Sequence, residues 1–118
     1  MSQNFKAGDF LIFQVESGYG LLRVLDVDDA GSDSVWHLSA YNDLFLDVEM
    51  ADAMLENPPS LTVSLPHIAL TNRAFESTQV AKMKNVPLDQ TELKAFEEWR
   101  LNGGEVSDRS VRLMMGLR

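Results

Sequence analysis

Runs of apolar residues in the first third of the chain predict three β-strands. The runs are short and rich in aromatic and β-branched side chains, and they cover residues 9–15, 21–27 and 35–41. Gly18 and Gly20 lie between the first two runs. Because glycine adopts positive φ without strain, these two residues favour a tight hairpin that joins the first strand to the second.

The third run also predicts which side of its strand lies in the core. Alternation places Trp36, Leu38 and Ala40 on one face, which we expect to be buried. The other face would carry Val35, His37, Ser39 and Tyr41. Acidic and small residues fill positions 28–34 just before this strand, and their composition predicts a loop.

The middle of the chain is less regular. Residues 48–55 have an approximately helical spacing of apolar positions, and Pro58 and Pro59 would end such a helix. Residues 61–65 alternate between apolar and polar and predict a strand. A further strand or extended segment is expected over residues 67–75.

The start of a helix at Asp89 is the best-specified local signal in the sequence. Asp89 and Glu92 have the spacing of a capping box, and Leu88 and Leu93 have that of a hydrophobic staple. Residues 102–104 are Asn-Gly-Gly, which tolerate left-handed backbone and predict the end of the helix.

Two further expectations concern the C-terminal quarter of the chain. Trp99 lies on the same helix face as Phe96 and Leu93, which favours packing against the core. A final short helix is expected around Val111, Met114 and Met115, capped by Ser107 or Asp108.

These elements together predict an α+β fold in one globular domain spanning residues 1–118. About five short strands, mostly antiparallel, would accompany one well-defined helix in the C-terminal half and one or two short helices. Short strands joined by glycine turns favour a strongly curved sheet or a small open barrel.

Charge is distributed very unevenly along this predicted domain. Residues 1–59 hold eleven acidic side chains against Lys6 and Arg23, a charge of −9. Residues 60–118 hold seven acidic and eight basic side chains, a charge of +1, which brings the chain to −8. An acidic half favours a basic protein as partner, and it disfavours nucleic acid and anionic lipid, which a basic surface would bind.

Composition removes several other classes of function. The chain has no cysteine, so disulfides, thiol catalysis and cysteine-ligated metals are excluded. The longest uncharged stretch, residues 57–72, is interrupted by prolines and is shorter than the roughly 20 apolar residues of a membrane span. No apolar signal core is present near Met1, and we therefore expect a cytoplasmic protein. No motif predicts a cofactor or a catalytic residue.

Three acidic or histidine-containing patterns partly match known metal or catalytic motifs. Residues 26–37 match a calcium loop at Asp26, Asp28 and Gly31 but place Ala30 and His37 where ligands are required, which favours an ordinary acidic turn. Asp47, Glu49 and Asp52 lie close together, and a solvated helix face is the simpler interpretation. His37 and His67 lack the spacing of a metal motif, so no metal site is predicted.

Arg23 is unusual because it lies in the middle of a predicted strand, among acidic residues, with no other cation between Lys6 and Arg73. One interpretation is an ion pair with a carboxylate on a neighbouring strand or loop. The other is a buried guanidinium at the mouth of a pocket, which would grip an anionic ligand bidentately.

The opening hairpin resembles that of small bacterial immunity proteins from polymorphic-toxin systems. The resemblance covers residues 8–27 and is carried by Gly8, Asp9, Gly18, Tyr19, Gly20, Arg23 and Val24. It implies a non-enzymatic inhibitor that binds a toxin domain. The acidic first half would suit a basic nuclease toxin, because complementary charge speeds encounter.

The sequence therefore leaves three hypotheses for function. The first is a non-enzymatic protein-binding module, for which the resemblance implies the narrower role of an immunity-type inhibitor. The second is a domain that binds a small anion through Arg23, and the third is an enzyme that uses carboxylates and a histidine. For the first, the predicted partner-binding residues are Asp28, Asp29, Asp33, Tyr19 and Arg23.

Overall fold

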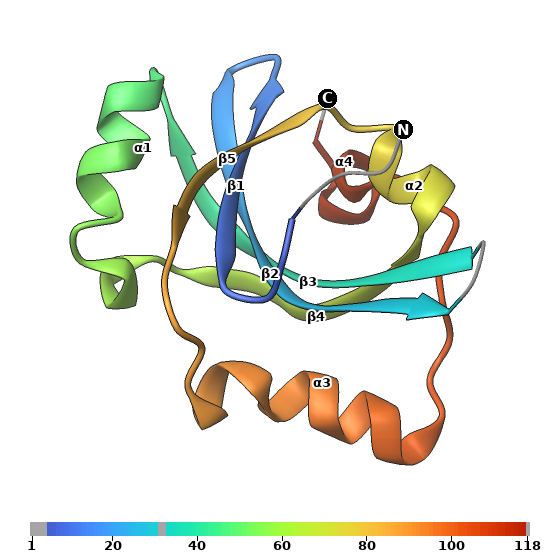
Figure 1. Cartoon of the computed structure of the whole chain (residues 1–118). Helices are drawn as coiled ribbons and strands as arrows, with labels where there is room; N and C mark the ends of the chain where they lie inside the picture. Colours follow the sequence, from blue (N-terminus) through green and yellow to red (C-terminus); the bar gives the residue numbers. More distant parts are fainter. Residues whose placement is uncertain (1–4, 31–32, 118) are drawn as a thin grey trace.

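Five antiparallel strands form one strongly curved sheet in the order β4-β3-β2-β1-β5 (Figure 1). The computed structural model describes residues 5–30 and 33–117, and of Asp29, Ala30 and Asp33 it describes the backbone alone. The strands are β1 (Asp9–Val15), β2 (Gly18–Ala30), β3 (Asp33–Phe45), β4 (Val63–Thr71) and β5 (Val80–Asn85). The predicted α+β class with a curved, mostly antiparallel sheet is confirmed.

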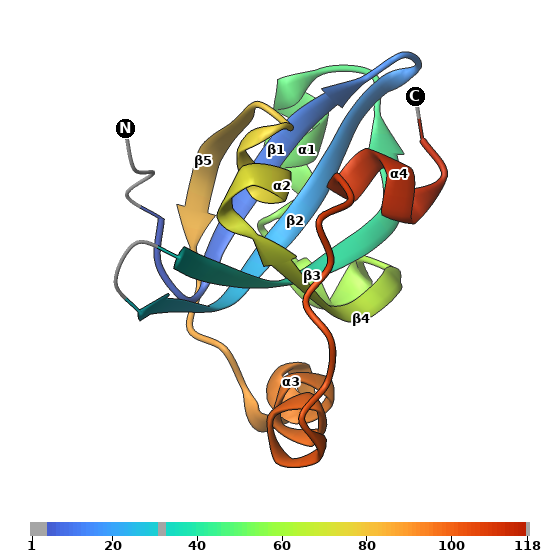
Figure 2. The same ribbon diagram turned by 90° about the vertical axis from the view of Figure 1, so that its right-hand side faces the viewer.

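Short helices cover both faces of this sheet (Figures 1 and 2). They are α1 (Val48–Met54), the 3-10 helix η1 (Pro58–Ser60), α2 (Asn72–Glu76), α3 (Gln90–Asn102) and α4 (Val111–Met115). Helices α2 and α4 contribute to one hydrophobic cluster, around Trp36 and Leu38. Helix α1 contributes to a second cluster, around Phe10 and Tyr41. Since alternate residues of β1 and β3 enter different clusters, each strand is buried on both of its faces.

The prediction of a loop over residues 28–34 is wrong for most of these residues. Strand β2 continues through Ala30 and β3 begins at Asp33, while Gly31 and Ser32 lie outside the described residues. The cause is pairing: Asp28 lies opposite Val35, and Asp29 opposite Ser34. Backbone hydrogen bonds to β3 override the low strand propensity of these acidic residues.

The boundaries around β4 also differ from the prediction. The two predicted segments over residues 61–65 and 67–75 form one strand, which ends at Thr71. Pro66 is tolerated inside it because β4 is an edge strand, where a missing N–H costs no ladder bond. Thr71 then caps α2 by accepting a hydrogen bond from the backbone N–H of Ala74. Strand β5 was not predicted, since its lysines and alanine carry no strand pattern.

The burial of β3 extends the prediction for this strand. Trp36, Leu38 and Ala40 are buried as predicted, but the opposite face also buries His37, Ser39 and Tyr41. The aromatic residues of α3 lie on His37, and residues of η1 and α3 lie around Ser39 and Tyr41. The predicted buried face of this strand is confirmed, and its opposite face is largely buried as well.

The two predicted helices of the C-terminal quarter are present. The capping box of α3 is complete, and the helix ends at Gly103 with φ of 64°. Helix α4 is capped by Ser110 instead of Ser107 or Asp108. Asp108 accepts hydrogen bonds from Thr71 and forms an ion pair with Arg73, so its carboxylate is used elsewhere.

We expect Gly20→Ala to lower the free energy of unfolding by about 1–3 kcal/mol through overpacking. Gly20 lies opposite Phe13 on β1, and a Cβ at Gly20 would lie 2.7 Å from the buried Phe13 ring. Urea denaturation checks this value, and Ser17→Ala in the exposed turn beside it should change stability by less than about 0.5 kcal/mol. Equal stability of the two variants would contradict the close packing at Gly20.

Candidate functional site

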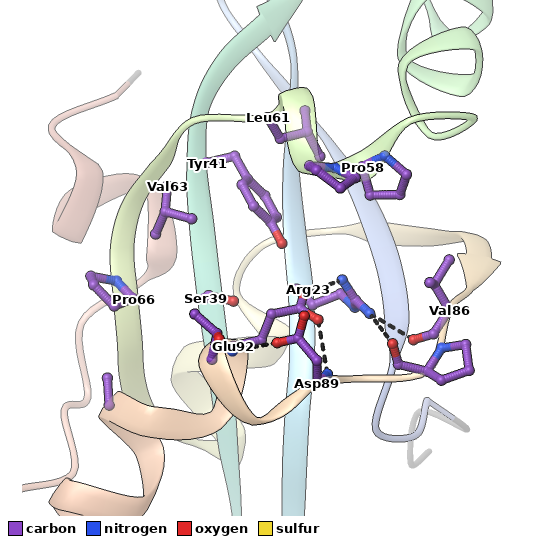
Figure 3. A pocket seen from close by; sticks show the side chains of 14 residues that line it. Arg23, Ser39, Tyr41, Pro58, Leu61, Val63, Pro66, Val86, Asp89 and Glu92 are labelled. Carbon is purple, nitrogen blue, oxygen red and sulfur yellow. Dashed lines mark hydrogen bonds and ion pairs between the residues drawn. The ribbon is translucent and has the colours of Figure 1, made fainter.

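A cleft of about 430 Å³ lies between η1 and the beginning of α3, on the sheet face opposite α2 and α4 (Figure 3). The side chains of Arg23, Ser39 and Tyr41 form its floor, from β2 and β3. Its walls are mainly apolar and include Pro58, Pro59, Leu61, Val63, Pro66, Val86 and Pro87. The size is within the usual range for a site that holds a small ligand or a side chain.

Prolines fix the backbone around this cleft. Pro58 and Pro59 form the 3-10 helix η1, three residues beyond α1. Pro87 lies between β5 and α3, and Pro66 lies in the edge strand β4. Since proline locks φ, the walls are preorganised before anything binds.

Arg23 is 1% exposed, and its guanidinium is held by four hydrogen bonds. Its Nε donates to the carbonyl of Gly8 at 3.1 Å, and Nη1 donates to Glu92 Oε2 at 2.7 Å. Nη2 donates to the carbonyls of Val86 at 2.6 Å and Pro87 at 3.3 Å. The guanidinium therefore joins β2 to the residues before β1, to the β5–α3 connection and to α3.

Both sequence interpretations of Arg23 are partly met. It forms an ion pair, though with a helix residue instead of a strand or loop carboxylate, and it is buried in the wall of a cleft. Its guanidinium also lies 4.2 Å from the ring centroid of Phe10. Because four of its five N–H groups are already used, bidentate capture of an anion is not favoured.

Glu92 connects the capping box of α3 to this buried arginine. Its Oε1 accepts a hydrogen bond from the backbone N–H of Asp89 at 3.1 Å, and its Oε2 accepts from Arg23. Asp89 in turn accepts from the backbone N–H of Glu92 at 2.8 Å. The capping box, which the sequence predicted, thus fixes the carboxylate that neutralises Arg23.

The hydroxyl of Tyr41 points toward Arg23 and Ser39 in the cleft (Figure 3). Burial raises the pKa of the Tyr41 phenol above its usual value, while the neighbouring charge of Arg23 acts in the opposite direction. The phenol therefore stays neutral at physiological pH, and it offers both a donor and an acceptor.

His37 and His67 form a hydrogen-bonded pair that the sequence did not predict. His37 Nδ1 lies 3.0 Å from His67 Nε2, and Phe96 and Trp99 of α3 lie on both rings. Burial lowers the pKa of His37, and Arg100 adds to this against the opposing effect of Asp26 and Asp28. Burial and then the neighbouring His37 lower the pKa of His67 to about 4. The pair is therefore neutral, with one ring donating to the other.

The register of β3 and β4 brings these two histidines together, although they lie 30 residues apart in the sequence. His37 lies opposite Ala69, so His67 is its diagonal neighbour on the adjacent strand. The prediction split β4 at Pro66 and left His67 outside the first strand segment. A continuous β4 would have placed both imidazoles on one face.

These histidines give little support to metal binding or acid–base catalysis. Among residues 5–30 and 33–117, no group of three or more His, Asp or Glu side chains could hold a metal ion. Within the same ranges neither imidazole hydrogen-bonds to a carboxylate, and His37 and His67 do not line the cleft. The carboxylates Asp47, Glu49 and Asp52 are all exposed, as a solvated helix face requires.

The predicted partner-binding residues are distributed along the hairpin. Tyr19 is half-buried at one end of β2, while Asp28 is exposed toward the other end. Asp28 lies nine positions after Tyr19 along β2, at most about 30 Å away in an extended strand. Arg23 lies between them and is buried, whereas the side chains of Asp29 and Asp33 lie outside the described structure.

A second surface feature lies at the junction of β3 and α1. Its apolar members Leu44, Leu46, Val48 and Met50 are 42%, 78%, 41% and 49% exposed. Its acidic members are Asp43, Asp47, Glu49 and Asp52. We call these eight residues the β3–α1 surface. The approximate helical spacing of residues 48–55 predicted a helix here, and the structure forms α1 but leaves Val48 and Met50 exposed.

Comparison of the chain with protein-family models, with curated proteins and with solved structures gives no match. The resemblance of residues 8–27 to immunity proteins therefore stays a prediction. In the described part of the chain, no helix combines the length and the apolar character that crossing a membrane requires.

We expect Arg23→Met to lower the free energy of unfolding by about 3–5 kcal/mol, because it leaves Glu92 and buried carbonyls without their donor. Glu92→Gln keeps an acceptor and should cost about 1–2 kcal/mol. Urea denaturation measures both. Glu98→Gln on the exposed side of α3 is the control and should change stability by less than about 0.5 kcal/mol. A loss below 1 kcal/mol for Arg23→Met would contradict the central role of this guanidinium.

We expect the stability of the protein to fall as pH decreases from about 6.5 to about 4. Below pH 6.5 the unfolded chain protonates His67, whereas the folded chain resists protonation until about pH 4. The loss should be about 1–3 kcal/mol over this interval. Urea denaturation at several pH values measures it, and His67→Phe, which keeps an aromatic ring against Trp99, should reduce the slope.

Asp108→Asn is the control for this pH dependence. The ion pair with Arg73 and the hydrogen bond from Thr71 lower the pKa of Asp108 below its usual 3.8, so its contribution is lost only below the histidine interval. An unchanged slope in His67→Phe, or an equal change in Asp108→Asn, would rule out the histidine pair as the cause.

Proposed function

We propose that the chain is a non-enzymatic protein-binding module that recognises a basic partner protein. The β3–α1 surface carries this proposal. Large apolar side chains that stay exposed in a close group commonly mark a protein interface. Here Leu46 is 78% exposed, and it lies among acidic side chains that would complement a basic partner.

The charge of the exposed side chains supports a basic partner. In residues 5–59, every acidic side chain that the structure describes is exposed or half-buried, with the exception of Asp9. Of the two basic residues in this range, Lys6 is exposed and Arg23 is buried against Glu92. The surface contributed by the first half is thus strongly acidic. Complementary charge raises association rates and suppresses acidic competitors.

We further propose that the module acts as an immunity-type inhibitor of a basic toxin domain. This narrower proposal depends on the resemblance of residues 8–27, whose Gly18, Tyr19 and Gly20 form the turn end of the β1–β2 hairpin. Tyr19 pairs with Phe45, directly before Leu46. The resembling hairpin and the β3–α1 surface are therefore neighbours, and a single partner could contact both.

We expect affinity capture from native cell lysate at low salt to recover one basic protein, and high salt to release it. The double variant Leu46→Lys/Met50→Lys places two cations on the β3–α1 surface and should reduce recovery at least tenfold, about 1.4 kcal/mol of binding free energy. Mass spectrometry identifies and quantifies the captured protein.

The matched control is Leu101→Lys/Leu113→Lys, which makes the same changes at leucines that are 84% and 69% exposed on α3 and α4. It should retain full recovery. Reversal of Asp28, Asp29 and Asp33 to lysine tests the other end of the β2–β3 hairpin. Equal recovery by all variants, or recovery that high salt does not affect, would contradict the proposed module.

A further inference from the structure

The charges around the cleft between η1 and α3 favour a cation. Arg23 is the one basic side chain among the residues that line it, and Glu92 and backbone carbonyls already accept from its N–H groups. The N-terminus of α3 is the other positive feature, and the carboxylate of Asp89 covers it. Arg23, Asp89 and Glu92 together give the lining a net charge of −1.

Acceptors for a cation remain available in the same cleft. Asp89 is exposed, and it takes part in none of the ion pairs found among the described residues. Its capping bond uses one carboxylate oxygen, Oδ1, and leaves the other. The hydroxyls of Ser39 and Tyr41, both at least nine-tenths buried, add acceptor sites at the floor.

The walls of the cleft suit an apolar stem attached to that cation. Pro58 and Leu61 lie on one side and Val86 on another, with Val63 and Pro66 completing the apolar boundary (Figure 3). A bare inorganic ion would gain nothing from these contacts, since only a ligand with apolar surface of its own is stabilised by burying it against these walls.

We propose that this cleft is a binding site for an organic cation, an ammonium or guanidinium group on a short apolar stem. The head would donate to Asp89 and to the hydroxyl of Tyr41, and the stem would lie against Pro58, Leu61 and Val63. The site is independent of the β3–α1 surface, and a free amine or a basic side chain of a protein presents the same chemistry to it.

The test is an NMR titration of the ¹⁵N-labelled full chain with benzylammonium, benzyl alcohol and benzoate, which share one apolar body and differ in charge. Benzylammonium should produce saturable shifts at the amides of Ser39, Tyr41, Leu61 and Glu92. Its dissociation constant should be at least tenfold lower than that of benzoate. Equal or tighter binding of benzoate, or shifts only outside the cleft, would overturn the proposal.

A conservative variant separates the charge of Asp89 from its capping role. Asn caps helices about as well as Asp, so Asp89→Asn should keep α3 folded and weaken benzylammonium binding at least fivefold. Asp47→Asn is the matched control, because Asp47 caps α1 through the same type of bond to Met50 and lies outside the cleft. Undiminished affinity in Asp89→Asn, or the same loss in Asp47→Asn, would also overturn the proposal.

Two sources of the cation are distinguished by adding N-acetyl-lysine N-methylamide as a fourth probe. Shifts of the same four amides by this probe support a site for a protein side chain, while binding of benzylammonium alone supports a site for a free amine. Failure of both overturns the proposal. If Leu46→Lys/Met50→Lys loses partner capture but still binds benzylammonium, the cleft and the β3–α1 surface are two separate sites.

Discussion

The buried guanidinium of Arg23 is the interaction on which the arrangement of this fold depends. It is 1% exposed, yet it bonds to the backbone before β1, to the β5–α3 connection and to the first turn of α3. A buried charge is costly unless it is paired and fully hydrogen-bonded. Because the carboxylate of Glu92 both completes the capping box of α3 and pairs with Arg23, the neutralisation of this charge is coupled to the docking of α3.

Helix α3 needs this anchor because its own apolar surface is small. Phe96 is its one buried residue in the described structure, and Leu101 is 84% exposed. The middle of the helix is held by Phe96 and Trp99 on the imidazoles of His37 and His67. The hydrogen bond between the two neutral imidazoles gives one nitrogen of each ring a partner inside an aromatic cluster. One end of α3 therefore depends on an ion pair and the middle on uncharged histidines.

Local signals in the sequence predicted the elements that depend on local chemistry. The capping box at Asp89 and the first strand are where the pattern places them, because caps and short apolar runs act within a few residues. Pairing between strands that are distant in the sequence determined the remaining elements. The acidic residues 28–30 became strand because β3 lies beside them, and β5 formed on the free edge of β1. The sequence offered a pocket at Arg23 as one interpretation, but it did not predict the carboxylate of Glu92 beside that arginine, because only the folded chain brings residues 23 and 92 together.

The same constraint explains the electrostatic character of the cleft. A strand arginine in an acidic sequence suggested a site for anions, and that expectation treated the guanidinium as free. In the folded protein the helix that closes the cleft brings the carboxylate of Glu92 to Arg23 and the carboxylate of Asp89 to the rim. Arg23 is neutralised by Glu92, and the charge that remains unpaired at the cleft is the carboxylate of Asp89. The polarity of a site is thus set by the charges that stay unpaired after folding, and in this cleft that charge is one carboxylate.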